Sequence, residues 1–589
     1  MSGFSTSDPR PAIAGALARA VREVDARAES RPDIRLERPR EAVHGDWASN
    51  VAMVLARQLG RPPRQLAEEI ARRIDLAGTG ASSVEVAGPG FLNFRLAADS
   101  ITQALAGIVA DNEAYGRSAA AAGEPVIVEW VSANPTGPLH LGHGRQAALG
   151  DAICELLAAT GWAVHREFYY NDTGKQMDLL ARSVHARRCQ LLGLPAGVPE
   201  GGYRGEYVLE LAREYEATTA DPIDDGDTTE RLDALRRFVV ELLRREQDVD
   251  LKDFQVRFDT YYLESSLFTD GLVASTVEAL EATGHVFRQD GAVWLRTTAF
   301  GDDKDRVMLR SDGTTTYFLS DVAYHVTKWQ RGFRRAINVQ GADHHGTTTR
   351  VRAGLLALGH PQDFPEWVLH QMVRLERGGR EVKLSKRAGG YTTLRELFEM
   401  VGVDVARYFF LMRRPEAHLV FDLEAALDQS EKNPVYKVQY AHARMCSIFA
   451  KAGDEVTAVA LAPGHADLSL LSHPAELDLA KALAEFPDLI ARAAEARAPH
   501  LLCEYLEQTA GTVNSWYHEG NPSRNPELAV LVPDPALRAA RLVLARAARV
   551  VLGNGLRMLN VSAPVRMERR LEDTVEPVTG GGPDESSGS

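Results

Sequence analysis

Residues 126–134 read VIVEWVSAN, and they are followed by PTGPLHLGHG at 135–144 and GRQAALGDAICELLAATG at 144–161. The first stretch is short and apolar, which predicts a buried strand. Proline and glycine in the second stretch predict a tight turn, and the third has the pattern of a helix that ends at Gly161. AVHREFYYND at 163–172 predicts another strand. Strand, helix and strand at these lengths indicate a βαβ unit of a parallel sheet.

The chain on both sides of this unit has other patterns. Residues 12–74 have apolar residues at helical spacing, and SVEVAGPGFLNFRLA at 83–97 predicts two short strands joined by a tight turn. Residues 180–290 are charged and helix-rich, which indicates an insertion in a nucleotide-binding fold. We expect the sheet to resume in AVWLRT at 292–297, TYFLSDVAYHV at 316–326, AINVQGADHH at 336–345 and VLHQMVRL at 368–375.

These patterns predict a multidomain protein with a Rossmann-like α/β catalytic domain at 121–403. A small α+β domain at 1–115 precedes it, and an α-helical bundle follows at 404–567. The tail at 568–589 is acidic, lacks aromatic residues and is rich in Gly, Ser and Pro. We therefore expect that tail to be disordered.

Composition indicates an ordinary globular protein. The chain has 589 residues, of which 45% are hydrophobic and 25% charged, and its formal net charge is -14. That charge argues weakly against a nucleic-acid partner, although a local basic face can hold phosphates on an acidic protein. Four widely spaced cysteines indicate reduced thiols, and no secretory signal or membrane-spanning run is visible. We expect a cytoplasmic protein with no membrane partner and no zinc.

His140 and His143 lie where the predicted turn meets the predicted helix. The first turn of a helix has free backbone N–H groups and a positive dipole end, so two imidazoles there can face a nucleotide phosphate. They can stabilise charge that builds on a phosphate under attack. A chance pair is the simpler alternative when this motif is taken alone. Zinc is disfavoured because the glutamate of an HExxH helix is missing.

A second motif, GGREVKLSKRAGG at 378–390, contains two of the ten lysines of the chain. Glycine on both sides permits a mobile loop, and the charges of Lys383 and Lys386 can neutralise a pyrophosphate leaving group. Ser385 can add a hydroxyl donor. A solvated basic loop is the simpler alternative for this motif alone.

Together the two motifs resemble the signatures of class I aminoacyl-tRNA synthetases. The family's His-Ile-Gly-His corresponds to His-Leu-Gly-His at 140–143, and its Lys-Met-Ser-Lys-Ser corresponds to Lys-Leu-Ser-Lys-Arg at 383–387. Leucine keeps the apolar bulk in both motifs. Arg387 departs from the final serine of the family, but it adds positive charge where phosphates are expected.

The closer resemblance is to arginyl-tRNA synthetases, and it extends over nearly the whole chain to about residue 567. The stretches that carry it are HGDWASNVAM, GFLNF, VEWVSANPTGPLHLGHGRQAALGD, YYNDTGKQM, TYFLSDVAYH, NPVYKVQYAHARM and LNVSAPVRM. The resemblance implies a ligase that activates L-arginine with ATP, accompanied by Mg²⁺, and transfers it to the 3′ end of tRNA(Arg). Family members are often monomeric and commonly need bound tRNA for activation, so we expect both properties here.

The resemblance also implies the site residues. Catalytic roles fall on His140, His143, Lys383 and Lys386. ATP contacts fall on His140, Gly142, His143, Gly341, Asp343, Lys383, Ser385 and Lys386. Arginine contacts fall on Glu129, Ser132, Asn134, His143, Tyr317, Asp321 and His345. We expect Asp321 to meet the guanidinium, which needs planar acceptors. If this stretch is helical, Tyr317 lies one turn earlier on the same face. Helix capping and core packing are the alternatives for these two residues.

In the arginyl family the N-terminal domain contacts the tRNA elbow and the helical bundle reads the anticodon. The implied tRNA contacts are Asp46, Trp47, Asn50, Tyr436, Gln439, Tyr440 and Arg444. Lesser candidates are His44, Gly45, His442, Trp516 and Tyr517. An exposed Trp47 could stack on an extruded base, but core packing is the favoured alternative. Helix packing is the alternative for the positions in the bundle.

Two other functions fit parts of the sequence. A different class I synthetase or a nucleotidyltransferase would share both motifs. A nucleotidyltransferase needs no helical third domain, however, and a synthetase for another amino acid has no use for Asp321. A regulatory RNA-binding protein that has lost catalysis would keep the fold, and the intact histidines and lysines speak against it.

Overall fold

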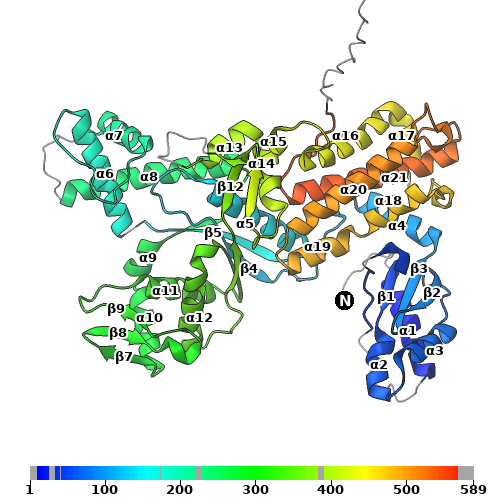
Figure 1. Cartoon of the computed structure of the whole chain (residues 1–589), viewed down its shortest axis with the longest axis horizontal. Coiled ribbons are helices and arrows are strands. Elements are labelled where there is room, and N and C mark those ends of the chain that lie inside the picture. The colour runs from blue at the N-terminus through cyan, green and yellow to red at the C-terminus, as the bar shows by residue number, and fades with distance from the viewer. Residues whose placement is uncertain are drawn as a thin grey trace, which may run out of the picture.

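The computed structural model describes residues 9–24, 34–39, 41–172, 174–219, 229–382 and 391–567. The lysine motif from Lys383 onward and the tail at 568–589 lie outside these residues. The described chain is elongated, with a parallel sheet near its middle (Figure 1). The helical bundle and the N-terminal domain lie toward one end of the molecule, and the inserted helices lie toward the other (Figure 1).

A five-stranded sheet forms the centre of the catalytic domain, with the strand order β11-β10-β4-β5-β6. Every pairing in it is parallel. Its strands are β4 (Pro125–Glu129), β5 (Ala163–Tyr170), β6 (Thr260–Leu263), β10 (Arg335–Gly341) and β11 (Glu366–His370). Helix α5 (Leu141–Ala159) connects β4 to β5. The predicted βαβ unit is therefore confirmed.

The order of the strands reverses between β4 and β10. From β4 the chain adds β5 and β6 on one side of the sheet, whereas β10 and β11 lie on the other side. Ligands of open parallel sheets bind beyond the carboxyl ends of the strands at such a reversal. Helix α5 starts there, directly after His140. The fold thus brings the first histidine motif to the position where a ligand is expected.

Helix α5 is buried on almost every side because its residues are small or apolar all round. Its charged members are held by partners in the protein. Asp151 forms a buried ion pair at 2.5 Å with Arg407 of α14 (Val403–Leu411). Arg145 donates to three backbone carbonyl oxygens from two later loops. These contacts fix the helix that carries the histidine motif.

Three expectations for the sheet are wrong. The stretch VLHQMVRL is divided: its first part belongs to β11, but Val373–Arg377 forms β12, which pairs with β13 (Arg380–Glu381) and β14 (Leu419–Asp422) in a separate sheet. Residues Tyr317–Gln330 form a helix, α11, because their buried apolar side chains recur at helical spacing. The segment AVWL forms β8 (Ala292–Leu295), which pairs antiparallel with β7 (Val286–Gln289) and β9 (Arg306–Leu309) in a separate three-stranded sheet. In addition, β6 falls inside the stretch expected as an insertion, yet it pairs with β5 in the central sheet.

The inserted helices form a satellite body with its own apolar core. They are α6 (Lys175–Leu191), α7 (Glu206–Thr218) and α8 (Thr229–Asp253). The long α8 runs from this body back to the sheet (Figure 1). Beyond β6 the catalytic domain continues with α9 (Glu264–Thr269), α10 (Leu272–Ala282), α12 (His345–Ala357) and α13 (Leu394–Val401).

The N-terminal domain packs three helices on a small antiparallel sheet of order β1-β3-β2. Its elements are α1 (Arg10–Val24), β1 (Trp47–Ser49), α2 (Val51–Leu59), α3 (Pro63–Arg73), β2 (Ala81–Ala87) and β3 (Phe91–Leu96). The predicted hairpin is confirmed. The helical prediction for 12–74 is wrong where β1 interrupts it.

The C-terminal part is helical, as predicted. Its longer helices are α16 (Pro434–Ala452), α18 (Pro474–Ala484), α19 (Phe486–Glu495), α20 (His500–Glu519) and α21 (Pro535–Met558). Their buried faces belong to one core that continues through α14 and α5 into the sheet. Within the described residues, none of the helices has both the length and the apolar character needed to cross a membrane.

Candidate active site

His140 caps the N-terminus of α5. Its Nδ1 accepts hydrogen bonds from the backbone N–H groups of Gly142 at 3.1 Å and His143 at 3.4 Å. In return, Nδ1 of His143 accepts from the backbone N–H of His140 at 3.4 Å. The two rings stack with their centroids 3.7 Å apart. Because each Nδ1 is an acceptor, each ring carries its proton on Nε2 and can donate from there.

Both imidazoles are neutral at pH 7. Burial lowers the pKa of His140. It lowers the pKa of His143 well below the usual range, and the nearby His140 and His370 add to that effect. The pair can therefore donate hydrogen bonds to phosphate oxygens but does not supply full positive charge. Such charge has to come from elsewhere, which is the role the sequence suggests for the lysine motif outside the described residues.

The fold adds a third histidine that sequence reasoning missed. His370 ends β11, in register with Gly341 of β10. It is buried, and its Nε2 has no hydrogen-bond partner among the described residues. Burial is the main cause that lowers the pKa of His370 to about 4. His370 is the third residue of the predicted strand VLHQMVRL, so the prediction gave it no special place, whereas in the structure β11 ends there and the strand order brings it near His143.

Buried carboxylates gather beside this site. Asp321 lies in α11, and its pKa is raised to about 7 by burial and by the negative charge of Glu264, against the opposing charge of Arg350. Glu129 raises it further. The pKa of Glu264 is also raised to about 7, by burial and by the charge of Asp172. Like charges held together out of water favour a cationic ligand, and a guanidinium can bind carboxylates in bidentate geometry.

Glu129 is already partnered within this cluster. Its Oε2 accepts from the buried Lys328 Nζ at 2.6 Å, and its Oε1 accepts from Ser132 Oγ at 3.0 Å. Ser132 and its neighbour Val131 both have positive φ, of 42° and 64°. Strained backbone of this kind clusters at functional sites. Glu129 and Ser132 are therefore held in place by these contacts, whereas Asp321 and Glu264 form no ion pair with any described residue.

The remaining expected arginine contacts lie nearer the surface. Tyr317 is 59% exposed at the start of α11, one turn before Asp321, as the spacing predicted. The Asn134 amide donates to Gln176 Oε1 at 2.7 Å. Asp343 and His345 are exposed in the turn that leads from β10 into α12. The structure brings these residues to the same end of the sheet as the histidine pair.

The loop before His140 is held by residues that sequence reasoning did not select. Gln247 of α8 donates to the carbonyl oxygens of Asn134 at 3.2 Å and Gly137 at 2.9 Å. Tyr207 of α7 donates to the carbonyl oxygen of Thr136 at 2.8 Å. The inserted helices thus position the catalytic loop directly. These polar residues carry no motif, so their partners become evident only in the fold.

Trp47 is buried in the core of the N-terminal domain, with an exposed fraction of 5%. The guanidinium groups of Arg10 and Arg38 lie over its ring, at 5.1 and 4.6 Å from the centroid. This burial and these contacts favour the core-packing alternative. Asp46 is nearly buried and accepts from the backbone N–H of Leu96 at 2.7 Å. Of the expected elbow contacts, Asn50 is exposed.

The same residues attach the N-terminal domain to the helical bundle. Three ion pairs bridge them: Arg10 to Asp488 at 2.6 Å, Arg38 to Glu485 at 2.5 Å and Asp46 to Lys481 at 2.9 Å. On the bundle side, Lys481 lies in α18, Asp488 lies in α19 and Glu485 lies between these two helices. Asp46, which the resemblance suggested for RNA, thus takes part in the junction between the domains, and Trp47 packs against two arginines that also do so.

The expected anticodon residues of α16 are also largely engaged. Gln439 is buried and donates to Asp404 at 2.9 Å and to the Ser562 carbonyl at 3.0 Å. Arg444 is packed between the rings of Tyr440 and Tyr517. Tyr436 and Tyr440 are half-buried. His442 and Trp516 are buried as well. Gln439 therefore anchors the C-terminal segment, and its amide is not free to read a base.

Comparison with known proteins agrees with this architecture. Three family models match in succession: "Arginyl tRNA synthetase N terminal domain" at 10–96, "tRNA synthetases class I (R), catalytic domain" at 104–408 and "DALR anticodon binding domain" at 438–567.

Similar full-length proteins are known. The arginine–tRNA ligase of Bordetella petrii is 51% identical over 553 residues, covering 92% of this chain and 96% of its own. That of Thiobacillus denitrificans is 50% identical over 541 residues, covering 91% and 95%. The solved structure of Thermus thermophilus arginyl-tRNA synthetase superposes with a TM-score of 0.72 at 26% identity, covering 95% of this chain and all of that one. Motifs, fold and relatives together assign the chain to the class I arginyl-tRNA synthetase family.

Proposed function

We propose that this chain is an arginine–tRNA ligase that acts in protein synthesis in the cytoplasm, with L-arginine, ATP and tRNA(Arg) as its substrates. The observation that carries the proposal is the combination of two sites at one end of the sheet. The histidine pair presents donors at a helix N-terminus, where anions bind. Beside it, the cluster around Asp321 concentrates negative charge where a guanidinium would be neutralised.

The proposed reaction has two steps. In the first, a carboxylate oxygen of arginine attacks the α-phosphorus of ATP, the bond to the bridging oxygen breaks, and pyrophosphate leaves. In the second, a hydroxyl of the terminal tRNA ribose attacks the arginyl carbonyl carbon and AMP leaves. The protein forms no covalent bond in either step, so positioning and charge stabilisation carry the rate.

Each motif has a place in this scheme. His140 and His143 would donate from Nε2 to the phosphate under attack, and Lys383 and Lys386 would neutralise the departing pyrophosphate. Magnesium is expected to arrive on the ATP phosphates. The described residues include no group of three or more His, Cys, Asp or Glu that could hold a metal ion.

Exchange of labelled pyrophosphate into ATP tests the first step. We expect exchange that depends on arginine and rises steeply when tRNA(Arg) is added, because family members commonly need bound tRNA for activation. Citrulline, which has the shape of arginine without its charge, serves as the control amino acid and should support no exchange. Equal exchange with and without tRNA would contradict the tRNA requirement, and exchange with another amino acid would contradict the pocket assignment.

The binding of arginine should depend on pH through the carboxylate cluster. Asp321 and Glu264 have pKa values of about 7 in the free protein, and a bound guanidinium would lower them. Protons must therefore leave on binding below pH 7, so affinity is full above that pH and weakens as the pH falls. Calorimetry should show a Kd that rises roughly tenfold from pH 8 to pH 6 for each proton released. A Kd that stays constant over this range would contradict the account.

A further inference from the structure

The loop from Asn134 to Leu139, which leads into the histidine motif, takes its shape from residues elsewhere in the chain. Its two prolines, Pro135 and Pro138, have no backbone N–H and cannot donate a hydrogen bond. Inside the loop, the Thr136 N–H donates to the Asn134 carbonyl oxygen at 2.8 Å. The carbonyl oxygens that follow accept instead from residues far away in the sequence.

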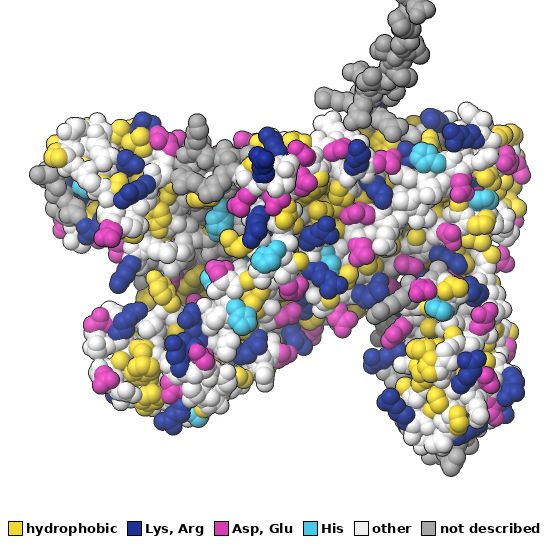
Figure 2. Space-filling view, in the orientation of Figure 1, with side chains coloured by type: hydrophobic (Ala, Val, Ile, Leu, Met, Phe, Trp, Pro, Cys, Tyr) yellow, Lys and Arg dark blue, Asp and Glu magenta, His cyan; other side chains and the backbone are white. Residues whose placement is uncertain are grey.

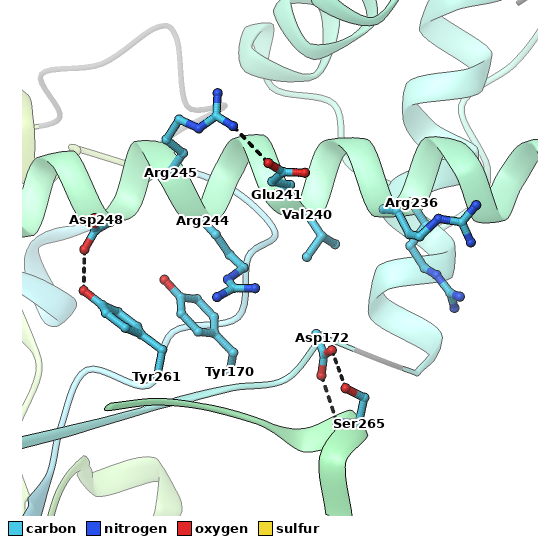
Figure 3. A pocket seen from close by; sticks show the side chains of 11 residues that line it. Tyr170, Asp172, Arg236, Val240, Glu241, Arg244, Arg245, Asp248, Tyr261 and Ser265 are labelled. Atoms are coloured by element: carbon cyan, nitrogen blue, oxygen red, sulfur yellow. Dashed lines mark hydrogen bonds and ion pairs between the residues drawn. The ribbon is translucent and has the colours of Figure 1, made fainter. Parts of the chain in front are cut away.

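Helix α8 supplies one of these outside contacts. Gln247 donates to two carbonyl oxygens of the loop and is only 1% exposed. Figure 3 shows α8 passing over the strands, where Asp248 of the helix accepts from the Tyr261 hydroxyl of β6. Asp250 accepts from Arg395 of α13 at 2.6 Å. Gln247 therefore belongs to a helix that is itself anchored to both β6 and α13.

Two tyrosines meet the loop at Gly137. The Tyr207 hydroxyl donates to the Thr136 carbonyl oxygen at 2.8 Å, and the Tyr391 hydroxyl donates to the Pro138 carbonyl oxygen at 3.3 Å. A Cβ atom at position 137 would lie 3.2 Å from Tyr207 Cζ and 3.3 Å from both hydroxyl oxygens. The missing side chain of Gly137 thus lets both rings close on the loop.

The two tyrosines come from different parts of the chain. Tyr207 lies in α7 and belongs to the core of the inserted helices. Tyr391 follows the lysine motif in the sequence and meets the His140 ring edge to face, with the ring centroids 5.9 Å apart. Directly after it, the Leu394 N–H donates to the Leu139 carbonyl oxygen at 2.7 Å. The backbone before His140 is therefore held from both parts of the chain.

This arrangement bears on the one donor that His140 can offer. Its Nδ1 accepts from the first turn of α5, so only Nε2 can donate to a phosphate. The direction of that donor depends on the backbone that carries the ring. Displacing a reacting group by about 1 Å can cost about 10²-fold in rate. Contacts that fix the loop are therefore expected to influence the chemical step.

Charge on the surface in view is not concentrated at one place. On the face drawn in Figure 2, Lys and Arg side chains are intermixed with Asp and Glu over all parts. The buried contacts around Gly137 are more specific. We propose that Tyr391 and Tyr207 are positioning residues for arginine activation, which hold the carbonyl groups on both sides of Gly137 and thereby aim Nε2 of His140. The proposal rests on the proposed function, because it requires the activation reaction.

Tyr391→Phe and Tyr207→Phe test the assignment, since each removes one hydroxyl and keeps the ring. Exchange of labelled pyrophosphate into ATP is measured at saturating ATP and tRNA(Arg) with arginine varied. Each variant should lower kcat about tenfold and leave the KM for arginine within about twofold, because an aimed donor is needed most in the transition state. Full kcat in both variants would overturn the proposal.

Tyr505→Phe is the matched control. Tyr505 is 7% exposed, as is Tyr207, and its hydroxyl donates to the Ala482 carbonyl oxygen of the helical bundle at 2.7 Å. The control loses the same kind of hydrogen bond away from the loop, so it should keep kcat within about twofold. An equal loss of kcat in all three variants would show a general effect of the lost bond and would contradict the positioning role.

A double-mutant cycle with His140→Ala identifies the group through which the tyrosines act. Once the imidazole is absent, loss of either hydroxyl should change kcat by less than about twofold. The same tenfold loss in both backgrounds would overturn the proposal, whereas the proposed function would stand. If the unmodified protein supports no arginine-dependent exchange, the proposed function itself fails. Should Tyr207→Phe misfold, the half-buried Tyr391 still provides the test.

Discussion

His143→Ala is expected to lower the rate of arginyl-adenylate formation by roughly 10²–10³-fold, the usual cost of removing one preorganised donor to a developing negative charge. The reason lies in the tautomer. Nδ1 of His143 accepts from the backbone of His140, so its Nε2 carries the proton that can be donated. The loss should appear in kcat, because the donor is needed most in the transition state. Single-turnover exchange and charging assays measure it.

The affinity for tRNA(Arg) should remain within about twofold of the unmodified protein, because His143 lies in the first turn of α5 and not in the helices expected to read the anticodon. Loss of the capping bond to His140 is expected to cost about 1 kcal/mol of stability. His143→Asn separates the two effects, since its side-chain oxygen can still accept from the backbone N–H but lacks the distant donor. Full activity in both variants would show that the pair is structural only.

Asp321→Asn is expected to raise the KM for arginine by about a hundredfold, which corresponds to about 3 kcal/mol for a lost buried charge pair. The substitution keeps the shape of the side chain and removes its charge. Steady-state charging at varied arginine concentration measures the effect. The preference for arginine over uncharged citrulline should shrink by the same factor, because the side chain at position 321 then carries no negative charge to pair with the guanidinium.

The same substitution should leave the melting temperature unchanged or raise it. Asp321 carries a pKa of about 7 because burial and the neighbouring Glu264 disfavour its charge. Removing that charge relieves repulsion in the unliganded protein. A variant that binds arginine poorly yet folds at least as stably separates a ligand-binding role from a capping or packing role. An unchanged KM, or a large loss of stability, would support those alternatives instead.

The sequence predicted the βαβ unit because its periodicity and turn residues are local signals. It placed Tyr317 and Asp321 one turn apart only on the condition that their segment is helical. It did not predict that their segment is a helix beneath the sheet and not one of its strands, because a short apolar run fits either state. The segment at 260–263 was missed as a strand because its partner, β5, lies about ninety residues earlier and only the fold brings them together.

The residues of the candidate site also differ in whether the sequence alone could identify them. His140 and His143 carry a motif, and its resemblance to the class I signature, together with the lysine motif, identified them. His370 and Glu264 carry none, and they join the site only through strand order and burial. Trp47 and Gln439 illustrate the opposite case, since their residue types suit RNA contacts but the fold commits them to packing and to internal hydrogen bonds. Residue type and spacing indicate what a side chain can do, whereas accessibility decides whether it is free to do it.

Charging of tRNA is the most direct measurement of the central claim. The purified protein is incubated with ATP, magnesium and total tRNA, and each labelled amino acid is offered in turn. The account predicts that arginine alone becomes attached to tRNA. Attachment of a different amino acid would contradict the pocket built around Asp321. Binding of tRNA without attachment of any amino acid would favour a regulatory protein that has kept the fold and lost the reaction.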